Sequence, residues 1–390
     1  SIGRLATPEK SEQLYLLGNE AAALGAIAAG SRFMASYPIT PASEIMEYMI
    51  KVMHKIHGTV VQTEDELASC MMAMGAGYAG VRAFTATSGP GLSLMAESIS
   101  MACMAEIPVV IIDVMRAGPS TGMATKVEQS DIGAGHGDAE KIVLAAAGIE
   151  DCFYITQEAF NLAEEYQTPV ILLSDLEFGM CKQSVPVFDE NRVPIRRGKL
   201  VREGLPELQK GEYFRRFADS EDGISQRTIP GVKNGMFLST GLEHNDYGKP
   251  AEAQSDRIIG MEKRHRKLQT VSKAIQPFTV TSEDTDADLL IIGITSTGGA
   301  IDEAMEMLKD TGKKINHLHL RLLSPFPEEE LRPYIEGAKQ VLIVEENLTA
   351  QLRELFASHF DCHDKLLSLL QYDGTPFVAS TIAKKAKEVL

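Results

Sequence analysis

The sequence has 390 residues, of which 44% are hydrophobic and 24% are charged, so it can fill two or three globular domains with large apolar cores. Its formal net charge of −16 argues against nucleic acid and anionic membranes as partners, because like charges repel. No apolar run reaches the roughly 18 residues that a spanning helix needs, and the polar N-terminal segment SIGRLATPEKSEQ is unlike a signal peptide. We therefore expect a cytoplasmic protein.

The cysteines predict neither disulfides nor a metal centre on this chain. They are Cys70, Cys103, Cys152, Cys181 and Cys362. Their number is odd and no two have C-x-x-C spacing, which indicates reduced thiols. No four-cysteine set could hold an iron–sulfur cluster, so such a cluster would have to lie on another chain. His359, Cys362 and His363 are within helical reach of one another, but no fourth ligand accompanies them.

From Leu14 to about Asp175, apolar β-rich runs alternate with longer segments of helical period, which is typical of a parallel sheet flanked by helices. The predicted strands are 33–36, 59–62, 82–86, 108–114, 152–155 and 169–173, and the predicted helices are 41–57, 64–79, 90–104 and 157–167. From Lys182 to about Ser282 the pattern dissolves into proline, glycine and charge. We interpret this stretch as a long excursion that packs on other parts of the chain.

A second β-α-β-α-β series follows the excursion. It consists of the strand ADLLIIGITS, a helix at 298–309, the strand INHLHLRLL, a helix near 328–335 and the strand QVLIVEEN. The sequence therefore predicts an α/β fold in three parts. These are a parallel-sheet domain at 14–250 that includes the irregular excursion from about 182, a linker at 251–283, and a smaller α/β domain at 284–390.

Polar residues follow four successive predicted strands of the first domain. They are YPITP at 37–41, TEDE at 63–66, TSGPG at 87–91 and RAGPSTG at 116–122. In an open parallel sheet, ligands bind beyond the carboxyl ends of the strands. We therefore expect one rim of the sheet to carry a hydroxyl, carboxylates, a glycine turn and a guanidinium.

Each of these residues also has a purely structural interpretation. Thr40 before Pro41 is typical of a helix N-cap with proline at the first helical position. Thr63 and Glu66 have the spacing of a capping box, and the SGPG run is a common turn signal. An arginine at the end of an apolar strand, such as Arg116, can also serve in a structural ion pair.

Taken together, the motifs YPITP, QTEDELA, FTATSGPG and VMRAGPSTG resemble the alpha subunit of the 2-oxoacid:ferredoxin oxidoreductases in order and spacing. The resemblance covers most of the chain, from LGNEAAALGAIAAG to a C-terminal unit similar to the transketolase C-terminal domain. It implies that 14–250 is a pyrimidine-binding thiamine diphosphate domain. In this family thiamine diphosphate lies between two subunits, and the beta-type partner carries the diphosphate and Mg²⁺ site and the iron–sulfur cluster.

The resemblance also assigns roles to residues of the rim. Glu66, with Glu64 as the near alternative, is similar to the glutamate that hydrogen-bonds the pyrimidine ring and promotes deprotonation of the thiazolium carbon. Thr40 is similar to the residue that hydrogen-bonds the 2-oxoacid, and Arg116 to the one that binds its carboxylate. The implied lining of the cofactor site comprises Tyr37, Pro38, Ser88, Gly89, Pro90 and Gly91.

The reaction that the resemblance implies is coenzyme A-dependent oxidative decarboxylation of a 2-oxoacid, with electrons passed through the partner's cluster to ferredoxin. The run PSTGMATKVEQSD is most similar to the 2-oxoglutarate branch, which forms succinyl-coenzyme A and carbon dioxide. Lys126 is a candidate cation for the distal carboxylate of that substrate, because an unpaired buried charge is costly. A solvated lysine is the alternative, and pyruvate, a branched-chain 2-oxoacid or an indolepyruvate are alternative substrates.

Two other functions stay open, namely a different thiamine enzyme such as a transketolase and a non-catalytic scaffold subunit. The chain has no diphosphate-binding G-D-G…N motif, so either thiamine enzyme requires a partner, and we expect a heterodimer or a dimer of heterodimers. Many bacterial relatives carry a gamma-type domain ahead of the matched region. Only about thirteen polar residues precede the match here, so that domain is separate or lost, or this chain is a fragment of a longer product.

Overall fold

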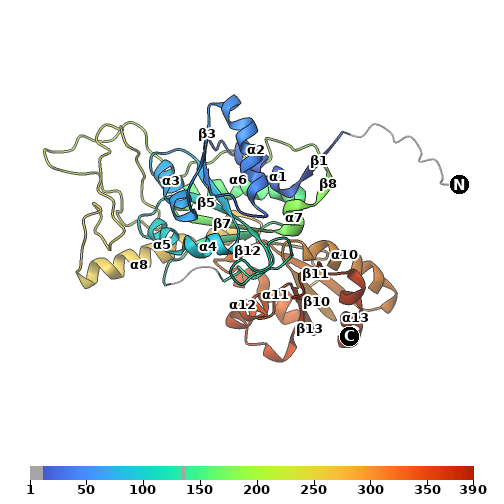
Figure 1. Ribbon diagram of the computed structural model, residues 1–390. Helices are drawn as coiled ribbons and strands as arrows, with labels where there is room; N and C mark the ends of the chain where they lie inside the picture. Colours follow the sequence, from blue (N-terminus) through green and yellow to red (C-terminus); the bar gives the residue numbers. More distant parts are fainter. Residues whose placement is uncertain (1–11, 134–136) are drawn as a thin grey trace.

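The computed structural model describes residues 12–133 and 137–390, and most of their strands belong to two α/β units (Figure 1). The first unit is built on a seven-stranded sheet of order β12-β6-β7-β5-β4-β2-β3. Its strands are β2 (Phe33–Ser36), β3 (Thr59–Gln62), β4 (Ala83–Thr87), β5 (Val109–Met115), β6 (Ile142–Ala145), β7 (Pro169–Asp175) and β12 (Leu322–Ser324). All paired neighbours are parallel except β12, which is antiparallel to β6. The predicted parallel-sheet α/β fold is confirmed.

Helices cover both faces of this sheet. One face packs against α1 (Gly18–Ala28), α2 (Ser43–Met53), α6 (Ile149–Tyr166) and α7 (Leu176–Met180), and the other against α3 (Glu66–Tyr78), α4 (Gly89–Leu94) and α5 (Ala96–Met104). All seven residues of β5 are buried. Val110, Ile112 and Val114 face the first layer while Val109 and Ile111 face the second, as the two-residue period of a strand requires.

The second unit forms the smaller lobe at the C-terminal end of the chain, coloured orange and red in Figure 1. Its sheet has the order β14-β13-β10-β11-β9. The strands are β9 (Phe278–Val280), β10 (Leu289–Gly293), β11 (Ile315–Leu320), β13 (Gln340–Glu345) and β14 (Leu366–Leu370), and the helices are α10 (Thr297–Leu308), α11 (Glu328–Gly337), α12 (Gln351–His359) and α13 (Ala379–Val389). One apolar cluster includes Ile111 of the first sheet and Ile292 of the second, so the two units share a core.

The excursion after the first sheet is fixed by buried ion pairs rather than by regular structure. β1 (Gln13–Leu17) and β8 (Lys182–Pro186) form a two-stranded antiparallel sheet, and α8 (Gln254–Leu268) and α9 (Val271–Ala274) follow much later. Glu164 of α6 accepts hydrogen bonds from Arg82 at 3.0 Å and from Arg227 of the excursion at 2.9 Å.

Short 3-10 helices occupy His54–Ile56, Lys309–Thr311 and His363–Lys365.

Two predictions about elements are wrong. The run 152–155 is part of helix α6, which is buried along most of its length, and a short apolar run does not separate a buried helix from a strand. The sheet instead receives β6. The segment 251–283 contains α8, and its role as a linker stays a prediction. The run INHLHLRLL is not one strand, because β11 lies in the second sheet and β12 pairs with β6 in the first. The domain limits 14–250 and 284–390 stay a prediction.

Among the described residues, no helix combines the length and the apolar character that crossing a membrane requires.

Candidate functional site

The four loops that the sequence predicts at one rim do share one edge of the first sheet. They follow β2, β3, β4 and β5, which are neighbours in the order β5-β4-β2-β3 and run parallel. The carboxyl ends of parallel neighbours meet at the same edge, where α/β proteins bind their ligands.

Glu66 is the first residue of α3 and is 5% exposed. The N-cap of this helix is Asp65, whose carboxylate accepts a hydrogen bond from the Ala68 N–H at 2.7 Å. The capping box expected for Thr63 and Glu66 is therefore wrong, and the Thr63 hydroxyl donates to the Asp65 carbonyl instead. Within the described residues no hydrogen bond or ion pair engages the Glu66 carboxylate, so it is free to meet a ligand. Glu64, the near alternative, is exposed.

The SGPG loop lies directly against Glu66. A Cβ atom built on Gly91 would be 2.6 Å from Glu66 Oε1 and would clash with Thr87 Oγ1, so only glycine fits there. Ser88 is the N-cap of α4 and is fully buried, and its hydroxyl has no hydrogen-bond partner in the described part of the chain. The loop therefore starts a helix, as its turn signal suggests. It also leaves a glycine surface beside Glu66.

Arg116 lies at the end of β5 and is 7% exposed. Its guanidinium donates from Nη1 to the Thr40 carbonyl at 2.5 Å and from Nη2 to the Thr121 carbonyl at 3.4 Å. No carboxylate of the described residues forms a salt bridge with it, and its buried Nε has no partner there, so the expected structural ion pair is not formed. The N-cap of α2 is Ala42, and the expectation that Thr40 caps this helix is also wrong.

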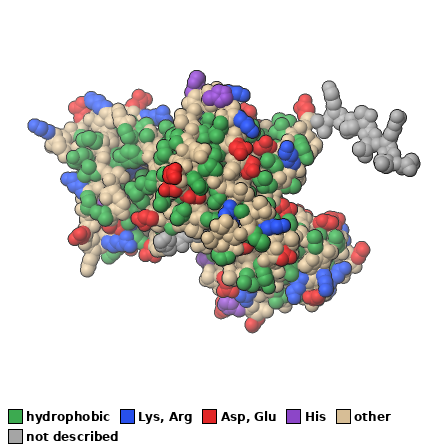
Figure 2. Space-filling model, viewed as in Figure 1, with side chains coloured by type: hydrophobic (Ala, Val, Ile, Leu, Met, Phe, Trp, Pro, Cys, Tyr) green, Lys and Arg blue, Asp and Glu red, His purple; other side chains and the backbone are tan. Residues whose placement is uncertain are grey.

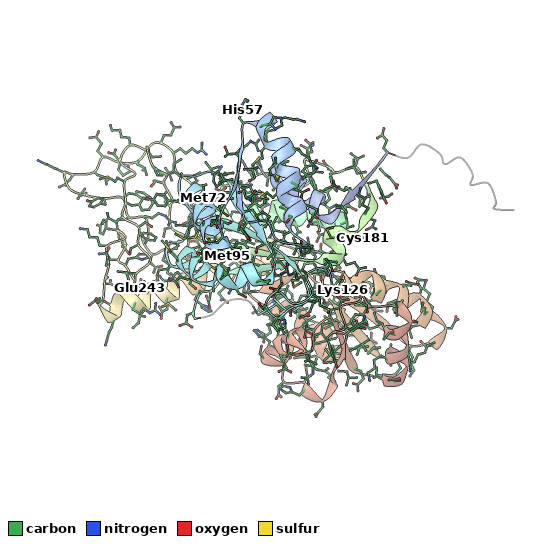
Figure 3. The ribbon with its side chains drawn as sticks, in the orientation of Figure 1. His57, Met72, Met95, Lys126, Cys181 and Glu243 are labelled. Atoms are coloured by element: carbon green, nitrogen blue, oxygen red, sulfur yellow. The ribbon has the colours of Figure 1, made fainter. Side chains whose placement is uncertain are left out.

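Tyr37, Pro38 and the Thr40 side chain are exposed at the end of β2, next to the Arg116 loop. Lys126 is exposed as well, and its carbonyl accepts a hydrogen bond from the Ala117 N–H at 3.0 Å. The loop therefore folds back and brings Lys126 beside the residue that follows Arg116. Lys126 lies at the junction of the two lobes (Figure 3).

A pair of acids under the rim, Asp113 and Asp131, was not predicted. Asp113 is in the middle of β5, fully buried, and Asp131 belongs to the loop after this strand. Burial and the neighbouring Asp131 raise the pKa of Asp113 well above its usual range. Burial also raises the pKa of Asp131 to about 6, although Asp113 and Arg116 oppose this shift. Two such carboxyl groups hold one proton between them. A Cβ atom on Gly89 would be 2.7 Å from Asp131 Oδ1, so the pair also contacts the SGPG loop.

This pair predicts a pH-dependent stability. The folded chain keeps a proton that the unfolded chain loses near pH 4, so stability falls as pH rises above about 4 and continues to fall past about 6, toward the raised pKa of Asp113. Asp113→Asn replaces the proton with a permanent N–H donor, and we expect the variant to be more stable than the wild type at pH 8 by on the order of 1 kcal/mol. The advantage should vanish near pH 4. Thermal unfolding at both pH values measures it, and a difference that does not change with pH would contradict the shared proton.

Two family models match the chain. The model for pyruvate flavodoxin/ferredoxin oxidoreductase, thiamine diphosphate-binding, matches residues 24–264, and the model for pyruvate:ferredoxin oxidoreductase core domain II matches residues 287–371. The first match spans more than half of the chain and contains all four rim loops.

Similar proteins agree with these matches. The alpha subunit of 2-oxoacid:ferredoxin oxidoreductase 2 from Aeropyrum pernix is 40% identical over 96% of this chain and 60% of its own length. The 2-oxoglutarate synthase subunit KorA from Methanothermobacter thermautotrophicus is 35% identical over 88% of this chain and 90% of its own length. This chain therefore spans about three fifths of the Aeropyrum relative and most of the KorA relative.

The solved 2-oxoglutarate:ferredoxin oxidoreductase from Magnetococcus marinus, with 2-oxoglutarate, coenzyme A and succinyl-CoA bound, superposes with a TM-score of 0.92. Its chain is 36% identical, and the match covers 99% of this chain and 67% of that one. A split-gene transketolase, 14% identical with a TM-score of 0.52, shares the fold alone. The sheet order, the rim and these matches define an α/β chain of the thiamine diphosphate-binding type. It belongs to the alpha subunits of the 2-oxoacid:ferredoxin oxidoreductase family.

Proposed function

We propose that this chain is the pyrimidine-holding subunit of an enzyme that converts 2-oxoglutarate and coenzyme A to succinyl-coenzyme A and carbon dioxide and reduces ferredoxin. The observation that carries this proposal is that the same edge of the first sheet holds a buried carboxylate and a buried guanidinium, neither of which forms a salt bridge within the described residues. These are Glu66 and Arg116. The KorA relatives and the Magnetococcus enzyme, which are named for 2-oxoglutarate, support the substrate.

The residues around Glu66 fit the aminopyrimidine of thiamine diphosphate. An aminopyrimidine presents ring nitrogens and an amino group at its edge, which a carboxylate can hydrogen-bond, and flat faces that a glycine loop can approach closely. When bound, thiamine diphosphate supplies a carbanion-stabilising centre for decarboxylation. Glu66 holds and releases a proton at the pyrimidine ring, and Gly91 keeps side chains out of that space. Ser88 supplies a further hydroxyl.

Arg116 would bind the carboxylate of the 2-oxoacid. Two carbonyls hold the plane of its guanidinium, and no acidic side chain of the described residues neutralises it in an ion pair, so the substrate can supply the missing negative charge. Thr40 is exposed and carries a hydroxyl, and its own backbone carbonyl accepts the hydrogen bond from Arg116. We assign this hydroxyl to the 2-oxo group and Lys126 to the distal carboxylate of 2-oxoglutarate.

The surface beside the rim supports the proposed partner subunit. Leu67, Met71 and Met72 of α3 and Leu94 of α4 are each at least 40% exposed, and hydrophobic side chains are visible over this part of the larger lobe in Figure 2. Methionine is enriched at protein interfaces, and exposed apolar patches mark them. We propose that a beta-type subunit covers this patch, contributes the diphosphate and Mg²⁺ site and the iron–sulfur cluster, and completes a cytoplasmic heterodimer or dimer of heterodimers. A gamma-type domain or subunit is a further proposed partner.

The main alternative is the same chemistry on pyruvate or a branched-chain 2-oxoacid. It is favoured by the names of the two matching family models, both of which refer to pyruvate.

The test is reduction of a viologen dye by this chain assembled with its partner subunit, thiamine diphosphate, Mg²⁺ and coenzyme A. A panel of 2-oxoacids serves as substrate. Turnover with 2-oxoglutarate alone supports the proposal in full. A preference for pyruvate or a branched acid keeps the mechanism and overturns the substrate, and no turnover with any acid favours a scaffold subunit.

Lys126→Met should separate the substrates. Loss of the ammonium removes a charge-assisted contact that only a dicarboxylic acid can make, so KM for 2-oxoglutarate should rise about tenfold or more, and KM for pyruvate should change far less. Lys51→Met, at an exposed position of α2, is the matched control and should alter neither value. An equal effect of Lys126→Met on both acids would remove Lys126 from the substrate site.

A further inference from the structure

Gln129 lies in the loop that follows Arg116 and is fully buried between the two units. A glutamine side chain has a polar acceptor and a polar donor that both cost free energy when they are buried without partners. Every polar group of Gln129 has a partner, and all but one of these partners belong to the second unit.

The backbone and the side-chain oxygen of Gln129 bind the loop after β13. Its N–H donates to the Glu346 carbonyl at 2.7 Å, and its carbonyl accepts from Asn347 Nδ2 at 3.0 Å. Oε1 accepts from the Glu346 N–H at 3.2 Å. Three hydrogen bonds therefore join two residues of this loop to Gln129.

The amide nitrogen of Gln129 reaches the loop after β10. Nε2 is 2.6 Å from Thr295 Oγ1, 3.1 Å from the Ile294 carbonyl and 3.4 Å from Asp175 Oδ2. Asp175 is the last residue of β7 and also accepts a hydrogen bond from the Ser296 N–H at 2.9 Å. The first sheet is therefore hydrogen-bonded to the same loop after β10. β10 and β13 are parallel neighbours, and Gln129 therefore bridges the carboxyl edge of the second sheet.

Thr295 is held in an unusual conformation at this contact. Its φ is +43°, in the left-handed region that β-branched residues rarely adopt. A residue keeps such an unfavourable backbone conformation only where many surrounding contacts hold it, and such residues are frequent at functional sites. The short hydrogen bond from Gln129 is one of the contacts that hold it.

We propose that Gln129 is a positioning residue: it fastens the loop that carries Arg116 and Lys126 to the second unit, so that this unit sets the geometry of the 2-oxoacid site. Two further contacts lie along the same loop. The Val127 N–H donates to the Gly374 carbonyl at 3.4 Å, and the Ala117 N–H donates to the Lys126 carbonyl. If Gln129 moved, the connected loop would therefore also move Arg116. The inference rests on the proposed function for its kinetic part only.

Gln129→Glu tests this in the assembled enzyme, because it keeps the shape and replaces the donor with a carboxylate that faces Asp175 and a carbonyl. We expect hydrogen exchange of the amides at 117–133 to become about tenfold faster or more. KM for the 2-oxoacid should rise by a similar factor, while kcat changes less. Thr295→Val removes one hydrogen-bond acceptor of Gln129, so it should raise both the exchange rate and KM by a smaller factor. This variant replaces Gln129→Glu in the test if Gln129→Glu does not fold.

Asn316→Asp is the matched control. Asn316 is another buried amide with all its groups hydrogen-bonded, but it joins β11 to the Thr281–Ser282 turn away from the substrate loop. This variant should lose thermal stability without changing KM or exchange at 117–133. If Gln129→Glu shows only the loss of stability that Asn316→Asp shows, the positioning role is overturned. If the wild-type enzyme oxidises no 2-oxoacid, the proposed function fails, whereas the exchange measurement still decides whether Gln129 anchors the loop.

Discussion

Glu66→Gln should reduce 2-oxoacid-dependent dye reduction by about 10²- to 10⁴-fold, the usual contribution of a positioned acid–base group. The amide has nearly the same shape as the carboxylate but cannot exchange a proton with the pyrimidine ring. Folding should be unaffected, since Asp65 rather than Glu66 caps α3 and no side chain of the described residues pairs with Glu66. The measurement is kcat of the assembled enzyme at saturating thiamine diphosphate, together with the melting temperature.

Glu64→Gln is the matched control for this experiment. Glu64 lies two residues earlier in the same loop but is exposed, so its amide variant should retain full activity. An active Glu66→Gln enzyme, or an inactive Glu64→Gln enzyme, would show that the wrong carboxylate has been assigned to the cofactor.

The rim could be predicted from the sequence because its information is local. Each loop follows an apolar run, and the parallel α/β pattern places all carboxyl ends at one edge, so YPITP, TEDE, TSGPG and RAGPSTG meet without any knowledge of distances. Local patterns could not predict which hydrogen bonds each side chain forms. Thr40 and Thr63 look like caps in sequence, yet Ala42 and Asp65 occupy the cap positions.

Errors in the fold arose where burial removes the usual periodicity. Helix α6 is buried on most of its surface, so CFYI resembled a strand, and the true strand β6 was missed beside it. Asp113 was a visible signal that went unused, because an acid within the apolar strand VVIIDVM must either be neutral or have a partner. Gln129 gave no signal at all. It lies in the polar run VEQSD. It is buried because it contacts residues of the second unit that lie more than 150 positions further along the chain.

The largest loss of stability is expected at Glu106, which fastens α8 to the first unit. Its carboxylate is 1% exposed and lies 2.5 Å from Lys263 Nζ and 3.2 Å from Lys267 Nζ, while Arg216 donates to its carbonyl at 2.7 Å. Burial alone would raise the pKa of Glu106, but the two ammonium groups outweigh it and lower that pKa. Burial lowers the pKa of Lys267 to about 8. One carboxylate thus compensates two buried ammonium groups, and the buried guanidinium of Arg216 lies beside them.

Glu106→Gln should therefore cost about 3 to 5 kcal/mol of unfolding free energy, the usual penalty for leaving buried charge without its partner. Lys263→Met should cost much less, because it leaves the neutral pair of Lys267 and Glu106. The exposed pair of Glu306 and Lys309 provides the control, and Glu306→Gln should change stability by about 1 kcal/mol at most. Denaturant unfolding of the three variants measures the order.

The order of these costs tests how a region with few regular elements is kept in place. If charge balance holds α8, the penalty must follow the number of ammonium groups of α8 that lose their carboxylate, which is two for Glu106→Gln and none for Lys263→Met. Equal penalties would mean that packing of the methylene stems, not charge, fixes the helix. Limited proteolysis adds a second measurement, since release of α8 in Glu106→Gln should expose the excursion around 200–250 to cleavage before the two sheets unfold.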